Sequence, residues 1–349
     1  MDEWRSTAPD PLVAGEVERL LDELIGDTDR YGQTYAALVV HCGAIVAERY
    51  AGAIPKKAGP DLPVDAGTPL LSWSMAKSVL HAVYGILVRD GLVALGDPAP
   101  VPSWQGAGDP RGGITIDALL AMRDGLDFVE EYGEGRSDVA EMLFQTGRED
   151  VAAFALARPA AHAPGEVFNY SSGTSNILAR IAGDIVERVE GPGPDAFTAF
   201  VERELFAPAG ITSARLGFDT AGTWVASSYV YATARDWARF GRLYLGDGLV
   251  DGARLLPDGW VAHGTRTRSI DPTDGTTYGA HWYTVDDGLG TFRASGYRGQ
   301  WILATPALDL LVVRLGHADE TCNDANTVWR AAIVDAFRGT GPTVTGRSG

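Results

Sequence analysis

The chain has 349 residues, of which 45% are hydrophobic and 21% charged, so it is long and apolar enough to build a large globular core. Its formal net charge of −17 disfavours nucleic acids and anionic membranes as partners, because both would be repelled. The two cysteines, Cys42 and Cys322, form neither a CxxC pair nor a disulfide framework.

Several classes of protein are disfavoured by missing signals. The N-terminal segment is acidic and has no basic stretch followed by an apolar one, which argues against a secretory signal, and no apolar run is long enough to span a membrane. We therefore expect a cytoplasmic protein. The six histidines show no ligand-like spacing, and neither a Walker A sequence nor a GxGxxG turn is present, so we expect no metal and no cofactor. The GxSxG elbow of α/β-hydrolases is also missing.

The predicted elements change character along the chain. Apolar spacing predicts a helix over residues 14–26, and two apolar runs around Cys42 and Gly43 predict a β-hairpin. Helical patterns then dominate from residue 74 to 245. The last third contains short strand-like runs and a closing helix, at residues 278–283, 291–294, 300–304, 308–315 and 327–337.

Strands thus lie towards both ends of the chain, with helices between them. This order predicts an α+β fold, an α/β sandwich in which one antiparallel sheet is built from both termini and flanked by helices. We expect residues 1–73 and 246–349 to form the sheet lobe and residues 74–245 to form a large, mainly helical inserted lobe. An active site would lie in the cleft between the two lobes.

A serine and a lysine stand three residues apart at the start of a predicted helix. On a helix, Ser74 and Lys77 share one face, and the first turn offers free N–H groups to a developing negative charge. Lysine occurs elsewhere only at positions 56 and 57, and every other basic residue is arginine. Because a buried lysine can lose its proton whereas arginine cannot, Lys77 is a candidate base for Ser74. The alternative is a serine that merely starts a helix beside a solvated lysine.

Two later segments offer partners. Tyr170 precedes a helical run in a loop rich in small polar residues, and a phenol near a protonated lysine can pass on a proton. The segment 294–301 is a Gly-containing strand against which a substrate can lie, with a backbone N–H donating to its oxyanion. A tyrosine packed at a helix entrance and a simple turn between strands remain the alternatives.

Together these segments resemble the serine β-lactamase and penicillin-binding-protein superfamily. The order is SxxK at Ser74, a tyrosine motif at Tyr170-Ser171-Ser172 and a late strand motif at Ala294-Ser295-Gly296. Within the superfamily the chain is most similar to class C-like esterases and to 6-aminohexanoate-dimer hydrolases, over about residues 35–337. The resemblance implies a β-lactamase-like fold.

The resemblance also implies roles for residues of the site. Ser74 would be the nucleophile, Lys77 its base or proton reservoir and Tyr170 the general acid/base, with the backbone N–H groups of Ser74 and Tyr297 forming the oxyanion hole. The expected substrate-binding residues, taken from the family pattern and the aromatic content, are Tyr132, Ser172, Trp282, Gly296 and Tyr297. Asp138 is a further candidate, for a substrate amine.

Departures from the family pattern narrow the expected chemistry. Ser172 replaces the asparagine of Tyr-x-Asn, and Ala294 replaces the lysine of Lys-Thr-Gly, which would hold a β-lactam carboxylate. We therefore predict a serine hydrolase that cleaves small amides or carboxylic esters. The alternatives are a β-lactamase or D-alanyl-D-alanine peptidase, an acyltransferase, and a non-catalytic binding protein on the same fold. The sequence indicates neither the physiological substrate nor the oligomeric state.

Overall fold

The computed structural model describes residues 10–132, 135–193, 195–272 and 274–338. Among these residues, an eight-stranded antiparallel sheet has the order β10-β11-β12-β13-β14-β15-β1-β2. Its strands are β1 (Gln33–His41), β2 (Ala44–Tyr50), β10 (Ser269–Ile270), β11 (Thr277–Tyr278), β12 (Tyr283–Thr284), β13 (Phe292–Gly296), β14 (Gln300–Thr305) and β15 (Leu310–His317). Because β1 pairs with β15, segments from the two ends of the chain lie side by side in one sheet. The predicted α+β fold is confirmed.

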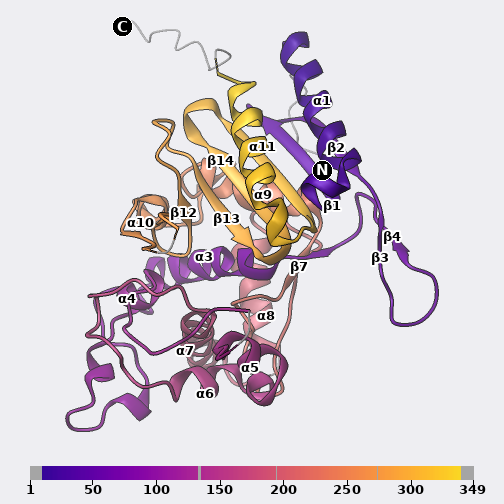
Figure 1. Ribbon diagram of the computed structural model, residues 1–349. Helices are drawn as coiled ribbons and strands as arrows, with labels where there is room; N and C mark the ends of the chain where they lie inside the picture. The colour runs from indigo at the N-terminus through magenta and orange to yellow at the C-terminus, as the bar shows by residue number, and fades with distance from the viewer. Residues whose placement is uncertain (1–9, 133–134, 194, 273, 339–349) are drawn as a thin grey trace, which may run out of the picture.

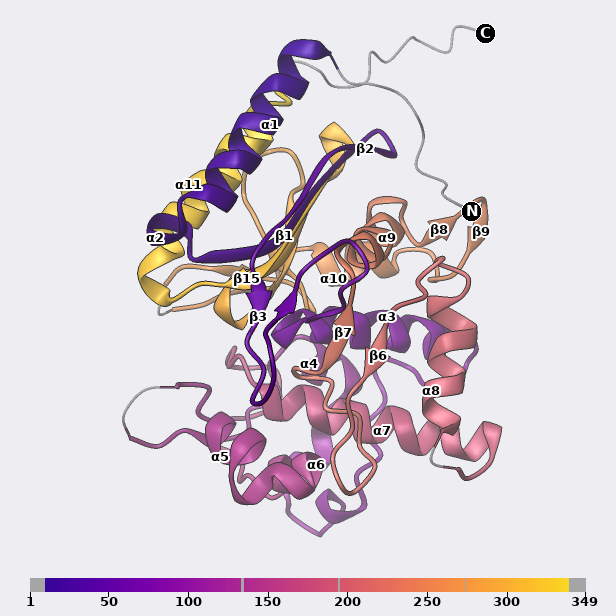
Figure 2. The ribbon, with the colours of Figure 1, turned by 90° about the vertical axis from the view of Figure 1, so that its right-hand side faces the viewer.

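Helices cover both faces of the sheet (Figure 2). On one face lie α1 (Pro11–Gly26) and α11 (Asn323–Asp335), and α9 (Ala234–Leu245) packs on the other. The alternating side chains of β14 divide between two cores, since Trp301 belongs to the α1/α11 side and Ile302 to the opposite side. A strand buried on both faces reads as a continuous apolar run, as residues 301–304 do.

The second half of the molecule is mainly helical (Figure 1). Its helices are α4 (Ile116–Leu120), α5 (Asp138–Phe144), α6 (Val151–Leu156), α7 (Ser172–Glu190) and α8 (Ala196–Val201), with α3 (Ala76–Arg89) between them and the sheet. The other α-helices and strands are short: α2 (Thr28–Tyr31), α10 (Trp260–Thr265), β3 (Ala53–Ile54), β4 (Leu62–Pro63), β5 (Leu70–Leu71), β6 (Arg215–Leu216), β7 (Val230–Ala232), β8 (Leu249–Val250) and β9 (Ala253–Arg254). The lobe boundaries at 73/74 and 245/246 stay a prediction.

The predicted strand at residues 278–283 is wrong. Tyr278 ends β11 and pairs with Tyr283 of β12, so the chain reverses between them. His281 has a positive φ of 57°, and a Cβ at position 279 would lie 2.0 Å from the carbonyl oxygen of Gly264. A glycine that lets two backbones touch, followed by a left-handed residue, produces a tight reversal within an apolar run.

No helix among the described residues is long and apolar enough to cross a membrane. The predicted cytoplasmic location stays a prediction.

Candidate active site

Ser74 lies in a single 3-10 turn (Trp73–Met75) that leads directly into α3. The pairing of β5 with β7 ends just before it, and buried Ser72 fastens the turn to β7. The Ser72 amide donates to the carbonyl of Val230 at 2.9 Å, and its Oγ donates to the carbonyl of Ser228 at 3.2 Å. The candidate nucleophile therefore lies between the paired strands β5 and β7, which hold the chain before it, and helix α3, which follows it.

The residue before Ser74 has an unusual backbone. Trp73 has a φ of 47°, in the left-handed region that a bulky side chain rarely adopts. Its ring stands edge-on to Tyr297, with 5.5 Å between the ring centroids. Ser74 itself is partly exposed. Strained residues of this kind occur at functional sites, where surrounding contacts hold the chain in place.

Lys77 is 1% exposed, and its Nζ atom donates to three oxygens. The distances are 2.8 Å to the Oγ of Ser74, 3.1 Å to the Oγ of Ser172 and 3.0 Å to the carbonyl of Ser227. The backbone at Ser227 is itself held in place, because its amide donates to the side-chain oxygen of Asn176 at 3.1 Å. The three protons of an ammonium group are thus all satisfied.

Burial lowers the pKa of Lys77 to about 8, and the negative charge of Glu130 acts in the opposite direction. Desolvation disfavours the charged ammonium, whereas a nearby carboxylate favours it. With a pKa of about 8, a useful fraction of the amine is neutral near physiological pH. Lys77 can then both accept a proton and return it.

Tyr170 faces the same lysine. The Nζ atom of Lys77 lies 4.9 Å from the centroid of the Tyr170 ring, and the ring packs 5.9 Å from those of Tyr278 and Tyr283. Burial raises the pKa of Tyr170 well above its ordinary value, and contact with Ser74 offsets part of this effect. The phenol therefore keeps its proton near neutral pH, in the form that can donate to a leaving group.

Glu130 is a charged neighbour that the sequence analysis did not single out. Its carboxylate accepts from both the amide of Ser172, at 2.7 Å, and the Oγ of Ser172, at 2.5 Å. Ser172 is the first residue of α7, where free N–H groups favour an anion. Burial raises the pKa of Glu130, while Lys77 and Ser172 act to lower it.

The late strand lies against the turn that carries Ser74. A Cβ at position 296 would lie 2.2 Å from the carbonyl oxygen of Ser72 and 3.2 Å from the amide nitrogen of Ser74. This close approach requires glycine, even though the backbone at Gly296 is ordinary extended chain. Tyr297 follows immediately, so its amide and that of Ser74 belong to two segments in direct contact.

An aromatic group lies beside Ser74. The rings of Tyr132 and Tyr297 stack with 4.7 Å between centroids, and the ring of Trp73 is nearly perpendicular to that of Tyr297. Phe144 of α5 extends the group, with 6.4 Å between its centroid and that of Trp73. Tyr132 and Phe144 are 37% and 46% exposed, so apolar area remains available to a ligand.

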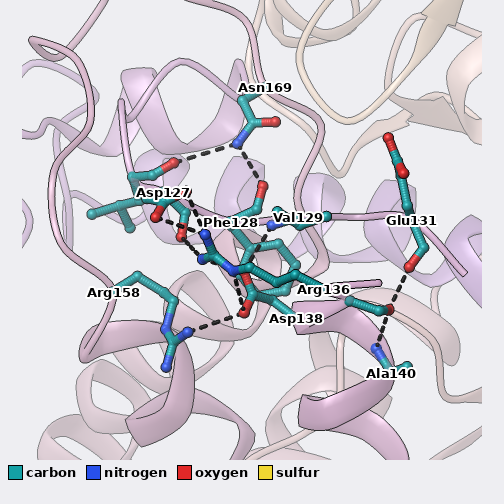
Figure 3. Close-up of polar contacts among 11 residues, drawn as sticks. Asp127, Phe128, Val129, Glu131, Arg136, Asp138, Ala140, Arg158 and Asn169 are labelled. Carbon is teal, nitrogen blue, oxygen red and sulfur yellow. Dashed lines mark hydrogen bonds and ion pairs between the residues drawn. The ribbon is translucent and has the colours of Figure 1, made fainter. Parts of the chain in front are cut away.

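Two of the predicted substrate-binding candidates lie elsewhere. Trp282 is 0% exposed and packs in the core against Phe240 and Tyr244, so it has no surface to offer a substrate. Asp138 is buried and accepts from the side chains of Arg136 and Arg158 and from a backbone amide (Figure 3). Its carboxylate is therefore occupied by cations of the protein itself, and a substrate amine would have to displace them.

Within the described residues, no group of three or more His, Cys, Asp or Glu side chains could hold a metal ion. A hollow of about 520 Å³ is lined by Asp117, Arg123 and Arg268. None of its lining residues is a predicted catalytic residue, and Asp117 and Arg268 already pair with each other.

Comparison with known proteins identifies the family of the chain. The Beta-lactamase family model matches residues 17–336. A 6-aminohexanoate-dimer hydrolase from Paenarthrobacter ureafaciens is 30% identical over 268 residues, which span 70% of this chain but only 65% of that relative. An uncharacterised protein of Mycobacterium tuberculosis is 28% identical over 345 residues, covering 77% of this chain and 83% of that relative.

Solved structures show the same fold. A candidate 6-aminohexanoate-dimer hydrolase from Bacillus anthracis has a TM-score of 0.74 and 22% identity, with 93% of this chain and 83% of that chain covered. A penicillin-binding-protein homologue from Caulobacter crescentus has a TM-score of 0.70 and 16% identity, with 95% and 99% covered. The fold is thus that of β-lactamase-like hydrolases. The chain belongs to the β-lactamase family, and it is related to 6-aminohexanoate-dimer hydrolase.

Proposed function

We propose that this protein is a serine hydrolase that cleaves small amides or carboxylic esters through an acyl-enzyme on Ser74. The observation that carries the proposal is the 2.8 Å contact between the Nζ of buried Lys77 and the Oγ of partly exposed Ser74. A nucleophile in contact with a base, which is oriented in turn by further groups, is the signature of covalent acyl transfer.

The geometry and the pKa directions support a division of labour. Lys77 has a pKa of about 8 and accepts the proton of Ser74 as the hydroxyl attacks the carbonyl. Tyr170, whose pKa is raised, protonates the leaving alcohol or amine and recovers its proton from the network around Lys77. Water then hydrolyses the ester on Ser74, which restores the free hydroxyl.

The oxyanion would rest on the backbone N–H groups of Ser74 and Tyr297. Support comes from the close approach at Gly296, which brings the two segments together without an intervening side chain. Donors fixed before the reaction stabilise the developing charge without reorganisation.

The aromatic group of Trp73, Tyr132, Tyr297 and Phe144 would bind the alkyl part of the substrate. Ala294 is 1% exposed and supplies no positive charge where the family pattern has a lysine. This favours uncharged or weakly charged acyl groups over β-lactams.

A panel of substrates tests the proposal. It contains p-nitrophenyl esters of increasing chain length, short linear amides including the 6-aminohexanoate dimer, and a chromogenic cephalosporin. We expect a burst with p-nitrophenyl acetate and steady turnover of medium-chain esters or amides, both abolished in Ser74→Ala. Turnover only of the cephalosporin would support β-lactamase activity instead.

Two further outcomes would replace the proposal. Ester products formed preferentially when an alcohol is added would identify an acyltransferase. Lack of any reaction of Ser74 with an acylating probe would favour a non-catalytic binding protein.

A further inference from the structure

Glu130 has a fixed position next to the predicted catalytic group. The segment that leads into it, residues 126–129, is held by hydrogen bonds to two side chains. Asn169, the neighbour of Tyr170, donates to the carbonyls of Leu126 and Phe128 at 3.3 and 3.0 Å, and the amide of Val129 donates to Asp138 at 2.9 Å (Figure 3). The loop that carries Glu130 and the loop that carries Tyr170 are therefore joined, and the carboxylate is held before any substrate arrives.

The hydrogen bonds of Ser172 have a defined direction. Its amide and its hydroxyl both point at the Glu130 carboxylate, which can only accept when ionised. A hydroxyl has one proton, so once it donates to Glu130 it can only accept from Lys77. The chain of donors therefore runs from Lys77 through Ser172 to Glu130.

This direction matters when Lys77 is neutral. A neutral amine keeps two N–H donors and gains one lone pair. The carbonyl of Ser227 can only accept, and Ser172 accepts because Glu130 takes its proton. Both N–H bonds are then engaged, and the lone pair is left for the hydroxyl of Ser74, 2.8 Å away.

We propose that Glu130 is a positioning residue that acts through the hydroxyl of Ser172 to aim the free amine of Lys77 at Ser74. Its negative charge at the same time favours the ammonium form of Lys77 between proton transfers. This inference rests on the proposed function. Without Glu130, the hydroxyl of Ser172 could donate to the neutral amine of Lys77. It would then compete with Ser74 for the lone pair of that amine.

Other groups around the lysine do not replace this charge. Tyr170, Tyr278 and Tyr283 keep their protons, because burial raises their pKa values. His281 is held neutral, since burial lowers its pKa to about 3. Among the residues that the structure describes, the charge that favours the ammonium form of Lys77 is that of Glu130.

Glu130→Gln is the most direct test, because it keeps the shape and removes one acceptor. The amide of Ser172 must still face an oxygen, so the NH2 group of the glutamine faces the hydroxyl of Ser172 and reverses it. Glu131→Gln is the matched control, since Glu131 is the adjacent residue and is exposed. Stopped-flow acylation by p-nitrophenyl acetate, from pH 6 to 10, gives both the plateau rate and the acidic limb.

For Glu130→Gln we expect a plateau about a hundredfold lower, as for a misaligned base, and an acidic limb moved to lower pH by about one unit. Glu131→Gln should match the wild type. Ser172→Ala keeps the carboxylate and should lower the plateau, and combining it with Glu130→Gln should add little, because the two residues act as one unit. Ser172→Ala also serves if Glu130→Gln fails to fold.

The inference is overturned if Glu130→Gln keeps the wild-type plateau, or if the plateau falls while the acidic limb stays in place, which indicates a purely structural role. A wild-type plateau in Ser172→Ala, or fully additive losses in the double variant, overturns it as well. Failure of the proposed function is distinguishable, since the wild type would then show no burst that depends on Ser74.

Discussion

A single methyl group at position 296 should disable the site while leaving most of the fold intact. In Gly296→Ala the new Cβ would lie 2.2 Å from the carbonyl oxygen of Ser72. Ordinary carbon–oxygen contacts are about 3.3 Å or longer, so β13 and the Ser74 turn must separate by about 1 Å. Since φ is −130° and ψ is 155°, alanine fits the backbone itself, and the close approach alone is tested.

The separation has two measurable consequences. Moving the amide of Tyr297 by this distance removes one of the two proposed oxyanion donors, and such losses lower kcat by about 10²–10³-fold. Overpacking should also lower the free energy of unfolding by about 1–3 kcal/mol. Steady-state hydrolysis of p-nitrophenyl acetate gives kcat, and urea unfolding followed by tryptophan fluorescence gives the stability.

Gly183→Ala provides the control for this experiment. Gly183 lies in α7, and a Cβ there would meet nothing within 4 Å. Alanine in a helix interior should raise stability by about 0.5–1 kcal/mol and leave kcat unchanged. A folded Gly296→Ala protein with the kcat of the wild type would refute the reasoning, because the two segments would then not need to touch.

Three further predictions concern the base, the loop and the core. For the wild type, kcat/KM should rise with pH to a plateau with an apparent pKa near 8 as Lys77 loses its proton. Lys77→Arg should lower kcat/KM about 10³-fold, since arginine stays charged. A flat profile of kcat/KM between pH 6 and 9 would contradict this role of Lys77. Asp138→Asn should lower the free energy of unfolding in urea by about 2 kcal/mol, because Arg136 and Arg158 lose a charged acceptor. An unchanged urea midpoint would show that these ion pairs do not stabilise the protein. Trp282→Ala should lower the free energy of unfolding by about 3–5 kcal/mol and should reduce activity only by reducing the fraction of folded protein. A raised KM in the folded variant would instead indicate that Trp282 contacts the substrate.

Local patterns in the sequence were sufficient to predict much of the architecture. The β1–β2 hairpin turns at Cys42, whose φ is 49°, and Gly43, as two apolar runs around a glycine predict. The helix after Ser74 follows from its apolar stripe and brings Lys77 onto the same face. Such features depend on neighbours within a few positions along the chain, so one sequence is enough to detect them.

Features set by distant contacts were harder to predict. Glu130 stands in an acidic pair with Glu131 and resembles a solvated surface segment, yet it meets Ser172 at the start of α7. The chain reverses around His281, within the run that the sequence predicts as one strand. The side of the sheet that Trp282 faces depends on this reversal, so the sequence could not show whether Trp282 lies in a pocket or in the core. Trp73 carried one usable signal, an aromatic residue directly before the serine, but its left-handed backbone follows from packing.

Covalent labelling of Ser74 tests the central proposal most directly. The protein is mixed with p-nitrophenyl acetate, quenched with acid during the burst and digested, and the peptides are analysed by mass spectrometry. We predict an acetyl group on the peptide that contains Ser74, at a level that follows the burst amplitude, and none on Ser74→Ala. An acetyl group found only on other residues, or a burst of equal size in Ser74→Ala, would contradict the account.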